Sequence, residues 1–126
     1  MKVAELEGAL LDLWVARAEG EVLAPAHPAP DPNSGTYWLK MGQFASVKPC
    51  PQYHRRWDDA GPLIDRGLVS LLFLPADSPD RTQDRWEAFT NAEGPSFESA
   101  SPLVAAMRAY VASKFGEEVP DIEKPL

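Results

Sequence analysis

Cysteine is nearly absent from this 126-residue chain, in which Cys50 is the only one. A single thiol excludes an intramolecular disulfide and is typical of proteins from a reducing compartment. Long hydrophobic runs are missing as well, since Glu5, Glu7 and Asp12 interrupt the apolar residues near the N-terminus. We therefore expect a cytoplasmic protein with neither a signal peptide nor a membrane-spanning helix.

Positive charge is also scarce. Asp and Glu number 19 against 12 Lys and Arg, which gives a formal net charge of −7. Broad attraction to nucleic acid or to an anionic membrane is therefore not expected. The strong nitrogen and sulfur ligands are only Cys50, His27 and His54, so we expect no metal site and no cofactor. The motifs G-x-x-x-x-G-K-S/T, G-x-G-x-x-G, G-x-S-x-G and H-E-x-x-H do not occur, which weakens the case for an enzyme.

Proline, by contrast, is abundant. The chain has 13 prolines, which cluster at 25–32, 49–51, 75–79 and 120–125. Because proline interrupts helices and strands, these clusters divide the chain into short segments and argue against a helical bundle. Residues 24–35 are expected to form an extended, solvated connection.

Residues 101–116 carry the clearest signal for secondary structure. Ser101 can accept a hydrogen bond from the first helical turn, and Pro102 fits the first helical position. Lys114 suits the carbonyl end of a helix, and Gly116 suits the left-handed residue that ends one. The pattern predicts a helix over 102–115 whose buried face is formed by Leu103, Met107, Tyr110, Val111 and Phe115.

Two more helices are predicted. Apolar residues at spacings of three and four predict a helix over about 4–19, which Gly20 ends. A short helix is expected over about 62–66, because Pro62 fits a first helical position and Gly67 an exit.

Strand-forming residues occupy 69–74 and, after a turn-rich stretch, 85–90. An antiparallel hairpin is the simplest connection between them. Residues 69–74 are apolar on both sides apart from Ser70, so both faces of this strand are expected to be covered. Weaker signals place further strands at 36–41 and 44–47.

Together these elements predict an α+β fold, in which the two longer helices and the short helix pack on one small antiparallel sheet. A chain of this length is expected to form a single domain, which we place at residues 1–116. The acidic, proline-bearing residues 117–126 are expected to form a loose tail.

Three segments of the chain are familiar when taken together: residues 6–20, Trp57 with residues 61–65, and residues 101–116 continued by 117–120. In this order they resemble the opening, the middle and the C-terminal end of the phage NinX-like proteins. These are small proteins of tailed bacteriophages and prophages, and their function is unknown. The resemblance implies a phage or prophage protein that works in a bacterial cytoplasm, and it transfers no activity, cofactor or catalytic residue.

Residues 48–57 are the strongest candidate for a binding segment. They hold three cations and two aromatic rings, where a Pro-Ser-Thr-Asp-like stretch is usual before the tryptophan in the family that the chain resembles. Arginine binds phosphate through its planar fork, and an exposed Tyr or Trp stacks on a base. The alternative is a surface loop that Trp57 anchors in the core. The candidate residues for a partner or a nucleic acid are Tyr53, His54, Arg55, Arg56 and Trp57.

Arg17 and Arg108 each lie on a largely apolar predicted helix. Their stems can lie on the core with the guanidinium in water. Alternatively, one of them forms an ion pair where helix and sheet meet, and the candidate partners are Asp12, Asp65 and Glu87.

The leading interpretation is a non-enzymatic phage accessory protein that binds a host or phage protein, because the domain is small and lacks a catalytic constellation. Homodimerisation through the sheet or a helix face fits a domain of this size. One alternative is a nucleic-acid-associated module that uses residues 48–57. A second alternative is a small enzyme with a site near His54, Asp58 and Asp59.

Overall fold

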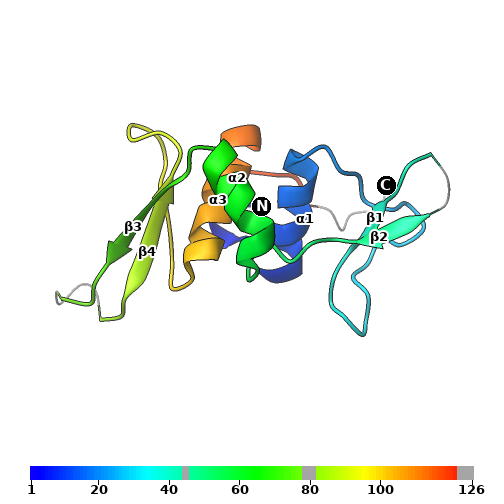
Figure 1. The fold of residues 1–126 in the computed structure, drawn as a ribbon, viewed down its shortest axis with the longest axis horizontal. Coiled ribbons are helices and arrows are strands. Elements are labelled where there is room, and N and C mark those ends of the chain that lie inside the picture. The colour runs from blue at the N-terminus through cyan, green and yellow to red at the C-terminus, as the bar shows by residue number, and fades with distance from the viewer. Residues whose placement is uncertain (44–45, 78–81, 122–126) are drawn as a thin grey trace.

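The computed structural model describes residues 1–43, 46–77 and 82–121 and shows an α+β fold, as predicted. Three α-helices lie between two small antiparallel sheets along the long axis of the molecule (Figure 1). The elements in chain order are η1 (Val3–Glu5), α1 (Gly8–Ala18), β1 (Trp38–Lys40), β2 (Val47–Pro49), α2 (Trp57–Arg66), β3 (Ser70–Leu74), β4 (Arg85–Phe89), β5 (Phe97–Ser99) and α3 (Pro102–Phe115).

Helix α3 is the centre of the fold and begins and ends where the sequence predicts. The side chain of Ser101 accepts a hydrogen bond from the Val104 N–H at 3.3 Å, and Gly116 follows the helix with φ 88°. The helix contacts α1 and α2 as well as strands β4 and β5. It is therefore buried around more of its circumference than one face, and the buried residues include Ala105, Ala106 and Ala109 beside the predicted Leu103, Met107, Tyr110 and Val111. The prediction was wrong for Phe115, which is the last residue of the helix and is 43% exposed.

The predicted helix over 4–19 is interrupted. A short 3-10 turn, η1, is followed by extended backbone at Leu6 and Glu7, and α1 then starts at Gly8 with φ +58°. Gly8 tolerates this left-handed conformation because it has no Cβ. The break turns the fully buried Leu6 side chain into the core, and its carbonyl accepts a hydrogen bond from Arg108 Nε at 2.8 Å.

Helix α2 is longer than the predicted helix over 62–66. It starts five residues earlier, at Trp57, and it carries Pro62 in its interior rather than at the first position. Asp58 and Asp59 lie in its first turn, where negative charge favours the N-terminal end of the helix dipole. The prediction missed this start because a proline inside a helix is normally unfavourable.

The predicted hairpin between 69–74 and 85–90 is confirmed. Strand β3 pairs antiparallel with β4, with Ser70 opposite Phe89 and Leu74 opposite Arg85. A third strand, β5, pairs with the other edge of β4 and was not predicted.

Strands β1 and β2 form a separate sheet, so the expectation of one common sheet was wrong. Trp38 lies opposite Pro49 in this pair, and the sheet lies beyond α1, on the far side of the helices from β3 and β4 (Figure 1). Of the predicted strand at 44–47, residues 44 and 45 lie outside the described residues, and β2 begins at Val47.

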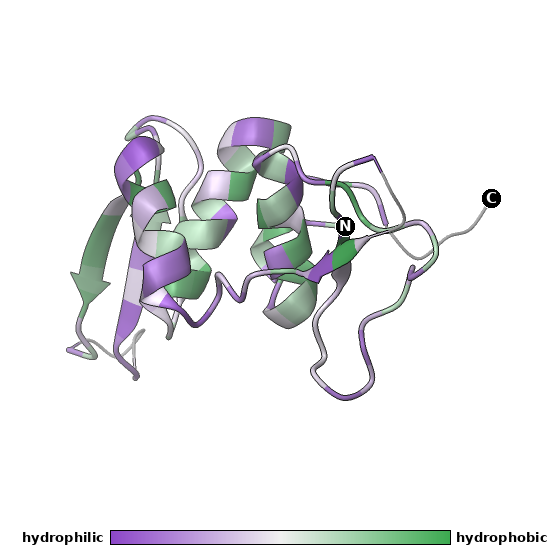
Figure 2. Ribbon diagram, turned by 45° about the vertical axis from the view of Figure 1, so that its right-hand side comes forward, coloured by the Kyte–Doolittle hydropathy of each residue, from purple (hydrophilic) through white to green (hydrophobic). Residues whose placement is uncertain are grey.

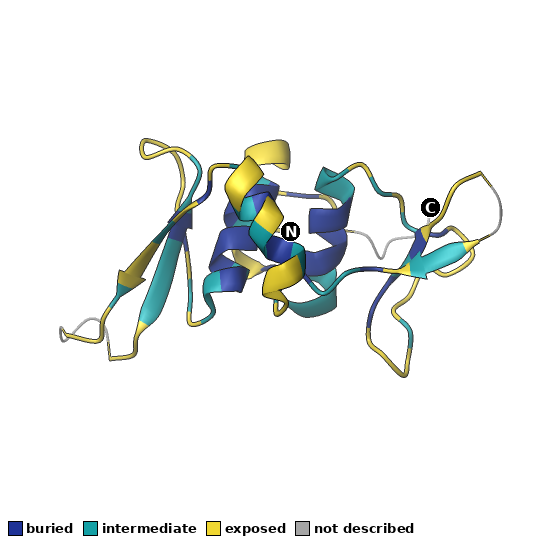
Figure 3. Ribbon diagram, viewed as in Figure 1, coloured by how far each residue is buried: buried dark blue, intermediate teal, exposed yellow. Residues whose placement is uncertain are grey.

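Strand β3 is not covered on both faces as expected. Leu72 is 48% exposed and Phe73 is 49% exposed, because β3 is an edge strand and α3 lies mainly over β4 and β5. Figure 3 shows the contrast between the buried helices α1 and α3 and the exposed outer strand.

The start of the expected loose tail is paired with the N-terminus. The Val3 N–H donates to the Glu117 carbonyl and the Val119 N–H donates to the Met1 carbonyl, both at 2.9 Å, and Val119 is buried. Residues 122–126 lie outside the described part of the chain. Among the described residues, the helices are too short and too polar to cross a bilayer.

Candidate functional site

The candidate residues 53–57 connect β2 to α2, and the structure gives each of them a different environment. Tyr53 is only 8% exposed, and burial raises the pKa of its hydroxyl well above the ordinary value. Its ring therefore belongs to the core and cannot stack on a base. Tyr53 therefore anchors this segment in the core. The surface-loop alternative had assigned this role to Trp57.

His54 holds the segment against α1 through Asp12. Its Nδ1 lies 2.7 Å from Asp12 Oδ2, and its backbone N–H donates to Asp12 Oδ1 at 2.8 Å. The Asp12 side chain is almost completely buried, and this burial raises the pKa of the carboxyl group, although the bonds from His54 act in the opposite direction. Both carboxyl oxygens are thus occupied by His54.

The cations of the segment are partly neutralised by local partners. Arg56 lies 3.2 Å from Asp58 Oδ2 and 3.5 Å from Asp59 Oδ2. Lys48 pairs with Glu21 at 2.9 Å, and Arg55 Nε donates to Gln52 at 2.6 Å. Gln52 is neutral, so Arg55 keeps its positive charge, whereas Lys48 and Arg56 are paired with carboxylates. One exposed cation in this segment is little for phosphate binding.

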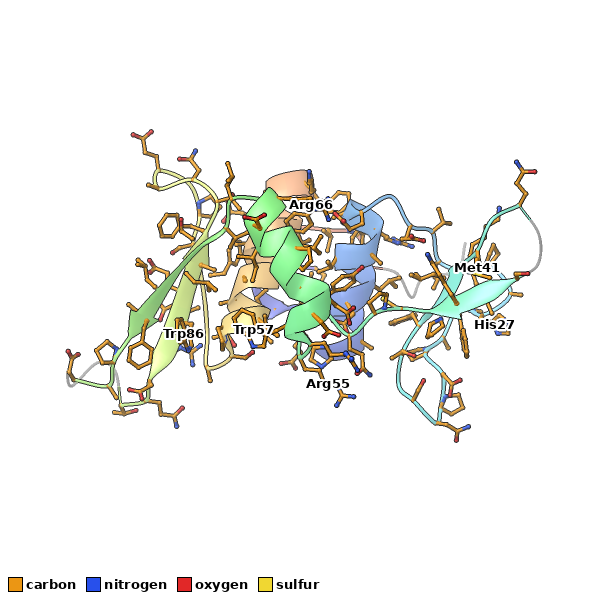
Figure 4. The ribbon with its side chains drawn as sticks, in the orientation of Figure 1. His27, Met41, Arg55, Trp57, Arg66 and Trp86 are labelled. Atoms are coloured by element: carbon orange, nitrogen blue, oxygen red, sulfur yellow. The ribbon has the colours of Figure 1, made fainter. Side chains whose placement is uncertain are left out.

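Trp57, the first residue of α2, is 55% exposed. Figure 4 shows Trp57 and Arg55 at the start of this helix. An exposed tryptophan of this kind is a feature of interaction surfaces rather than of cores.

A cleft of about 590 Å³ lies beside the segment, and we call it the Trp38 groove. Its exposed lining is largely apolar and includes Trp38, Pro49, Cys50 and Pro51. Charged residues also line it, namely Asp31 from the proline-rich stretch and Arg56 and Asp59 from the start of α2. The groove is wide open to solvent rather than enclosed.

A second, smaller cavity of about 190 Å³ lies against Asp12 and His54. It is lined mainly by polar groups, among them Ser34, Thr36 and Gln52. The Ser34 and Thr36 hydroxyls lie 2.9 Å apart and bond to each other. His54 faces this cavity while its Nδ1 is engaged by Asp12, so the imidazole acts first as a structural link.

The residues of the enzyme alternative are not brought together. His54 lines the small cavity, Asp59 lines the Trp38 groove, and Asp58 is exposed and paired with Arg56. Cys50 is buried, which raises the pKa of its thiol to about 12 and keeps it protonated and unreactive near neutral pH. Within the described ranges, no three His, Cys, Asp or Glu side chains are grouped so that they could hold a metal ion.

A scan against protein-family models matches residues 2–114 to the family described as "Bacteriophage P22, NinX". The chain belongs to this family. The match spans nearly the whole described fold, including both walls of the Trp38 groove and the segment 53–57. No curated protein gave a significant match to the chain. Family membership thus identifies a phage accessory protein and adds no activity.

In this NinX-family chain the two helix arginines have structural partners. Arg108 donates to the Leu6 carbonyl at 2.8 Å and to the Glu98 carbonyl at 3.2 Å, so it joins α3, the start of the chain and β5. Arg17 lies over the Trp14 ring at 4.8 Å from its centroid. Arg108 thus bonds to backbone carbonyls and Arg17 contacts an aromatic ring, whereas the sequence indicated carboxylates as their partners.

Asp65, the third candidate for an ion pair, is exposed near the end of α2. The neighbouring Arg66 makes the ion pair instead, with Glu19 Oε1 at 2.6 Å, and the Tyr110 hydroxyl donates to the other oxygen of Glu19. Sequence reasoning missed this three-helix link because its members are far apart in the chain.

Proposed function

We propose that this phage protein is a non-enzymatic protein-binding module and that the Trp38 groove receives an extended segment of its partner. The observation that carries the proposal is the composition of the groove, whose lining combines the apolar Trp38, Pro49 and Pro51 with charged side chains. Protein interfaces likewise combine apolar contact surface with polar and charged groups.

The shape of the groove favours a polypeptide over a small molecule. Small-molecule sites enclose most of their ligand, whereas this cleft is wide open to solvent. Trp38 and Arg56 both line it, and they offer a flat apolar ring and a guanidinium. Tryptophan and arginine are the residue types that contribute most often to binding energy at interfaces.

Charge indicates the kind of segment. The lining contains Asp31 and Asp59 against the single cation Arg56, and the whole chain has a net charge of −7. A partner segment with apolar residues in its centre and basic residues at its flanks would complement both features. Its association should slow as salt is added, because the attraction is screened.

The environment of the other candidate residues supports this proposal over its rivals. Nucleic-acid binding by 48–57 would need several stacking rings and free cations. Tyr53 is buried, and both Lys48 and Arg56 are paired with carboxylates. This leaves one exposed ring, Trp57, and one cation without a carboxylate partner, Arg55. Catalysis would need an activated nucleophile, but Cys50 is buried and its pKa is raised to about 12.

The test is recovery of phage and host proteins by the tagged chain from infected cells, in the wild type and in two tryptophan variants. Trp38→Ala removes the aromatic ring that lines the groove, and Trp57→Ala removes an exposed tryptophan that does not line the groove. Far-UV circular dichroism establishes that both variants are folded. We expect a protein that is recovered with the wild type and with Trp57→Ala, and at least about tenfold less with Trp38→Ala.

Two results would contradict the proposal. If Trp57→Ala abolishes recovery and Trp38→Ala does not, the binding surface is the start of α2 and not the groove. If the wild type recovers only DNA or RNA, released by nuclease and by salt, the nucleic-acid alternative holds instead.

A further inference from the structure

The outer edge of β3 is unpaired among the described strands. The sheet order is β3-β4-β5, so β4 occupies one edge of β3 and leaves the other open. Natural edge strands are usually protected by a charged side chain, a proline or a bulge, because open edges pair with other strands. Strand β3 reads Ser-Leu-Leu-Phe-Leu and has none of these devices.

Exposed apolar side chains are concentrated at this edge. Eight large hydrophobic side chains are exposed in the described part of the chain, and three of them, Leu68, Leu72 and Phe73, fall within six residues. Leu68 alone is 79% exposed. Figure 2 shows β3 as a hydrophobic strand at the outer border of the fold, away from the helices.

We propose that β3 pairs antiparallel with β3 of a second copy, so that two three-stranded sheets join into one sheet of six strands. The symmetry of a dimer limits the possible registers. A two-fold axis perpendicular to the sheet leaves each side chain on the same face of the sheet. Two residues that lie directly opposite each other must therefore both be odd-numbered or both be even-numbered. The register that pairs the whole strand is centred on Leu72.

This register gives every side chain of β3 a neutral partner. Leu72 lies opposite Leu72 of the second copy, Leu71 opposite Phe73, and Ser70 opposite Leu74. No like charges are opposed at the seam, even though each copy has a net charge of −7. Cross-strand pairs of this kind stabilise a sheet by about 0.2–1 kcal/mol each relative to alanine pairs.

The pairing also extends two apolar rows that each copy already contains. On the face toward α3, Phe73 lies opposite Trp86 with ring centroids 5.2 Å apart, and Leu71 lies opposite the buried Ala88. Across the seam, Phe73 of one copy adjoins Leu71 of the other. Each row then runs over four strands, from Trp86 and Phe73 of one copy to Leu71 and Ala88 of the other. Because each row of one copy continues into a row of the other, β3 is complementary to itself. This is the reason for proposing a second copy and not a strand of another protein.

The first experiment measures mass in solution by sedimentation equilibrium, from about 1 to about 200 μM protein. We expect a wild-type dimer that Leu72→Lys converts to a monomer, because a lysine at the axis would face a second lysine. Met41→Lys is the matched control, since Met41 is 49% exposed in the loop after β1 and lies outside β3. It should remain a dimer.

The second experiment tests the register with cysteine variants and avoids charged substitutions. Directly opposed Cα atoms lie about 4.5–5.5 Å apart, which suits a disulfide. Leu72→Cys should therefore cross-link to itself under mild oxidation. Ser70→Cys should do so at least about tenfold more slowly, because Ser70 lies about 13 Å along the strand from its copy. A mixture of Ser70→Cys and Leu74→Cys should form the mixed dimer. The native Cys50 is buried and does not compete.

A wild type that stays monomeric over the whole concentration range overturns this proposal, as does a dimer that Leu72→Lys leaves intact. Equal cross-linking of Leu72→Cys and Ser70→Cys overturns the register and with it the symmetric pairing. The proposal does not depend on the Trp38 groove. Trp38→Ala should leave the dimer unchanged, so failure of one proposal is distinguishable from failure of the other.

Discussion

The Nδ1 atom of His54 lies 2.7 Å from Oδ2 of Asp12, although the two residues are 42 positions apart in the chain. The His54 N–H reaches the other carboxyl oxygen at 2.8 Å. One buried side chain on α1 thereby fixes both the backbone and the ring of the residue that leads into α2. This link positions the segment 53–57 and one side of the Trp38 groove.

Asp12→Ala is expected to destabilise the protein by about 2 kcal/mol, because it leaves a half-buried imidazole and a backbone N–H without their charged acceptor. Asp12→Asn should cost less, since its amide oxygen can still accept from the His54 N–H. Urea unfolding measures both free energies. Asp65→Ala, at an exposed position on α2, is the control and should change stability little. Equal effects of Asp12→Ala and Asp65→Ala would show that the link contributes nothing.

Gly67 and Gly61 form a matched pair for testing how closely α2 and α3 approach. A Cβ on Gly67 would lie 2.8 Å from the Leu63 carbonyl oxygen and 2.8 Å from the Tyr110 ring, although the backbone φ of −82° suits any residue. Gly67→Ala should therefore cost about 1–3 kcal/mol through overpacking. Gly61, inside α2, has open space around it apart from its chain neighbours. The helix propensity that alanine adds at this position is opposed by the contact of its Cβ with the Pro62 ring, so Gly61→Ala should change stability by less than about 1 kcal/mol. Thermal and urea unfolding compare the two variants, and a loss with Gly67→Ala no larger than with Gly61→Ala would refute the packing argument.

The stability of the fold should decrease in alkaline solution. Burial, with the charges of Asp12, Glu21 and Asp59, raises the pKa of Cys50 from 9.0 to about 12. Burial and the bond to Glu19 raise the pKa of Tyr110 from 10.0 to about 12. Unfolded chains lose these protons first, so the stabilisation is complete below pH 9.0 and is lost as pH rises toward about 12.

Urea unfolding at pH about 8 and about 10.5 measures this loss. Cys50→Ala removes one titrating group and should reduce the slope of stability against pH. A wild-type stability that stays constant across this interval, or an unchanged slope in Cys50→Ala, would contradict the assignment.

The sequence predicted α3 almost completely because the signals for this helix are local. Ser101 bonds to a backbone group only three residues away, and Pro102 and Gly116 act at the helix ends themselves. The β3–β4 hairpin was predictable for the same reason, since its strands are neighbours in the chain. Such local signals can be read without knowing the tertiary contacts of the segment.

The rest depended on packing between distant segments. Residues 69–74 have the composition of a covered strand, but α3 lies mainly over β4 and β5, so β3 is left at the exposed edge. Both rings of 53–57 were candidates for stacking, but the structure buries Tyr53 and leaves Trp57 exposed at the start of α2. The bond between His54 and Asp12 could be found only once α1 and the loop were placed side by side.

Leu68 offers a test of local backbone strain at the entrance to β3. Its φ of 53° lies in the left-handed region, where a Cβ crowds the backbone, and its side chain is 79% exposed. Leu68→Gly should stabilise the folded chain by about 0.5–1 kcal/mol. This value is the strain energy that glycine removes minus the cost of the greater conformational entropy of glycine in the unfolded chain. The measurement is urea unfolding in the Leu72→Lys background, so that association at the β3 edge does not contribute. Leu68→Ala removes the same exposed side chain but keeps a Cβ, and it should give no gain. If Leu68→Ala stabilises as much as Leu68→Gly, the exposed leucine side chain lowers the stability of the wild type, and its backbone conformation does not.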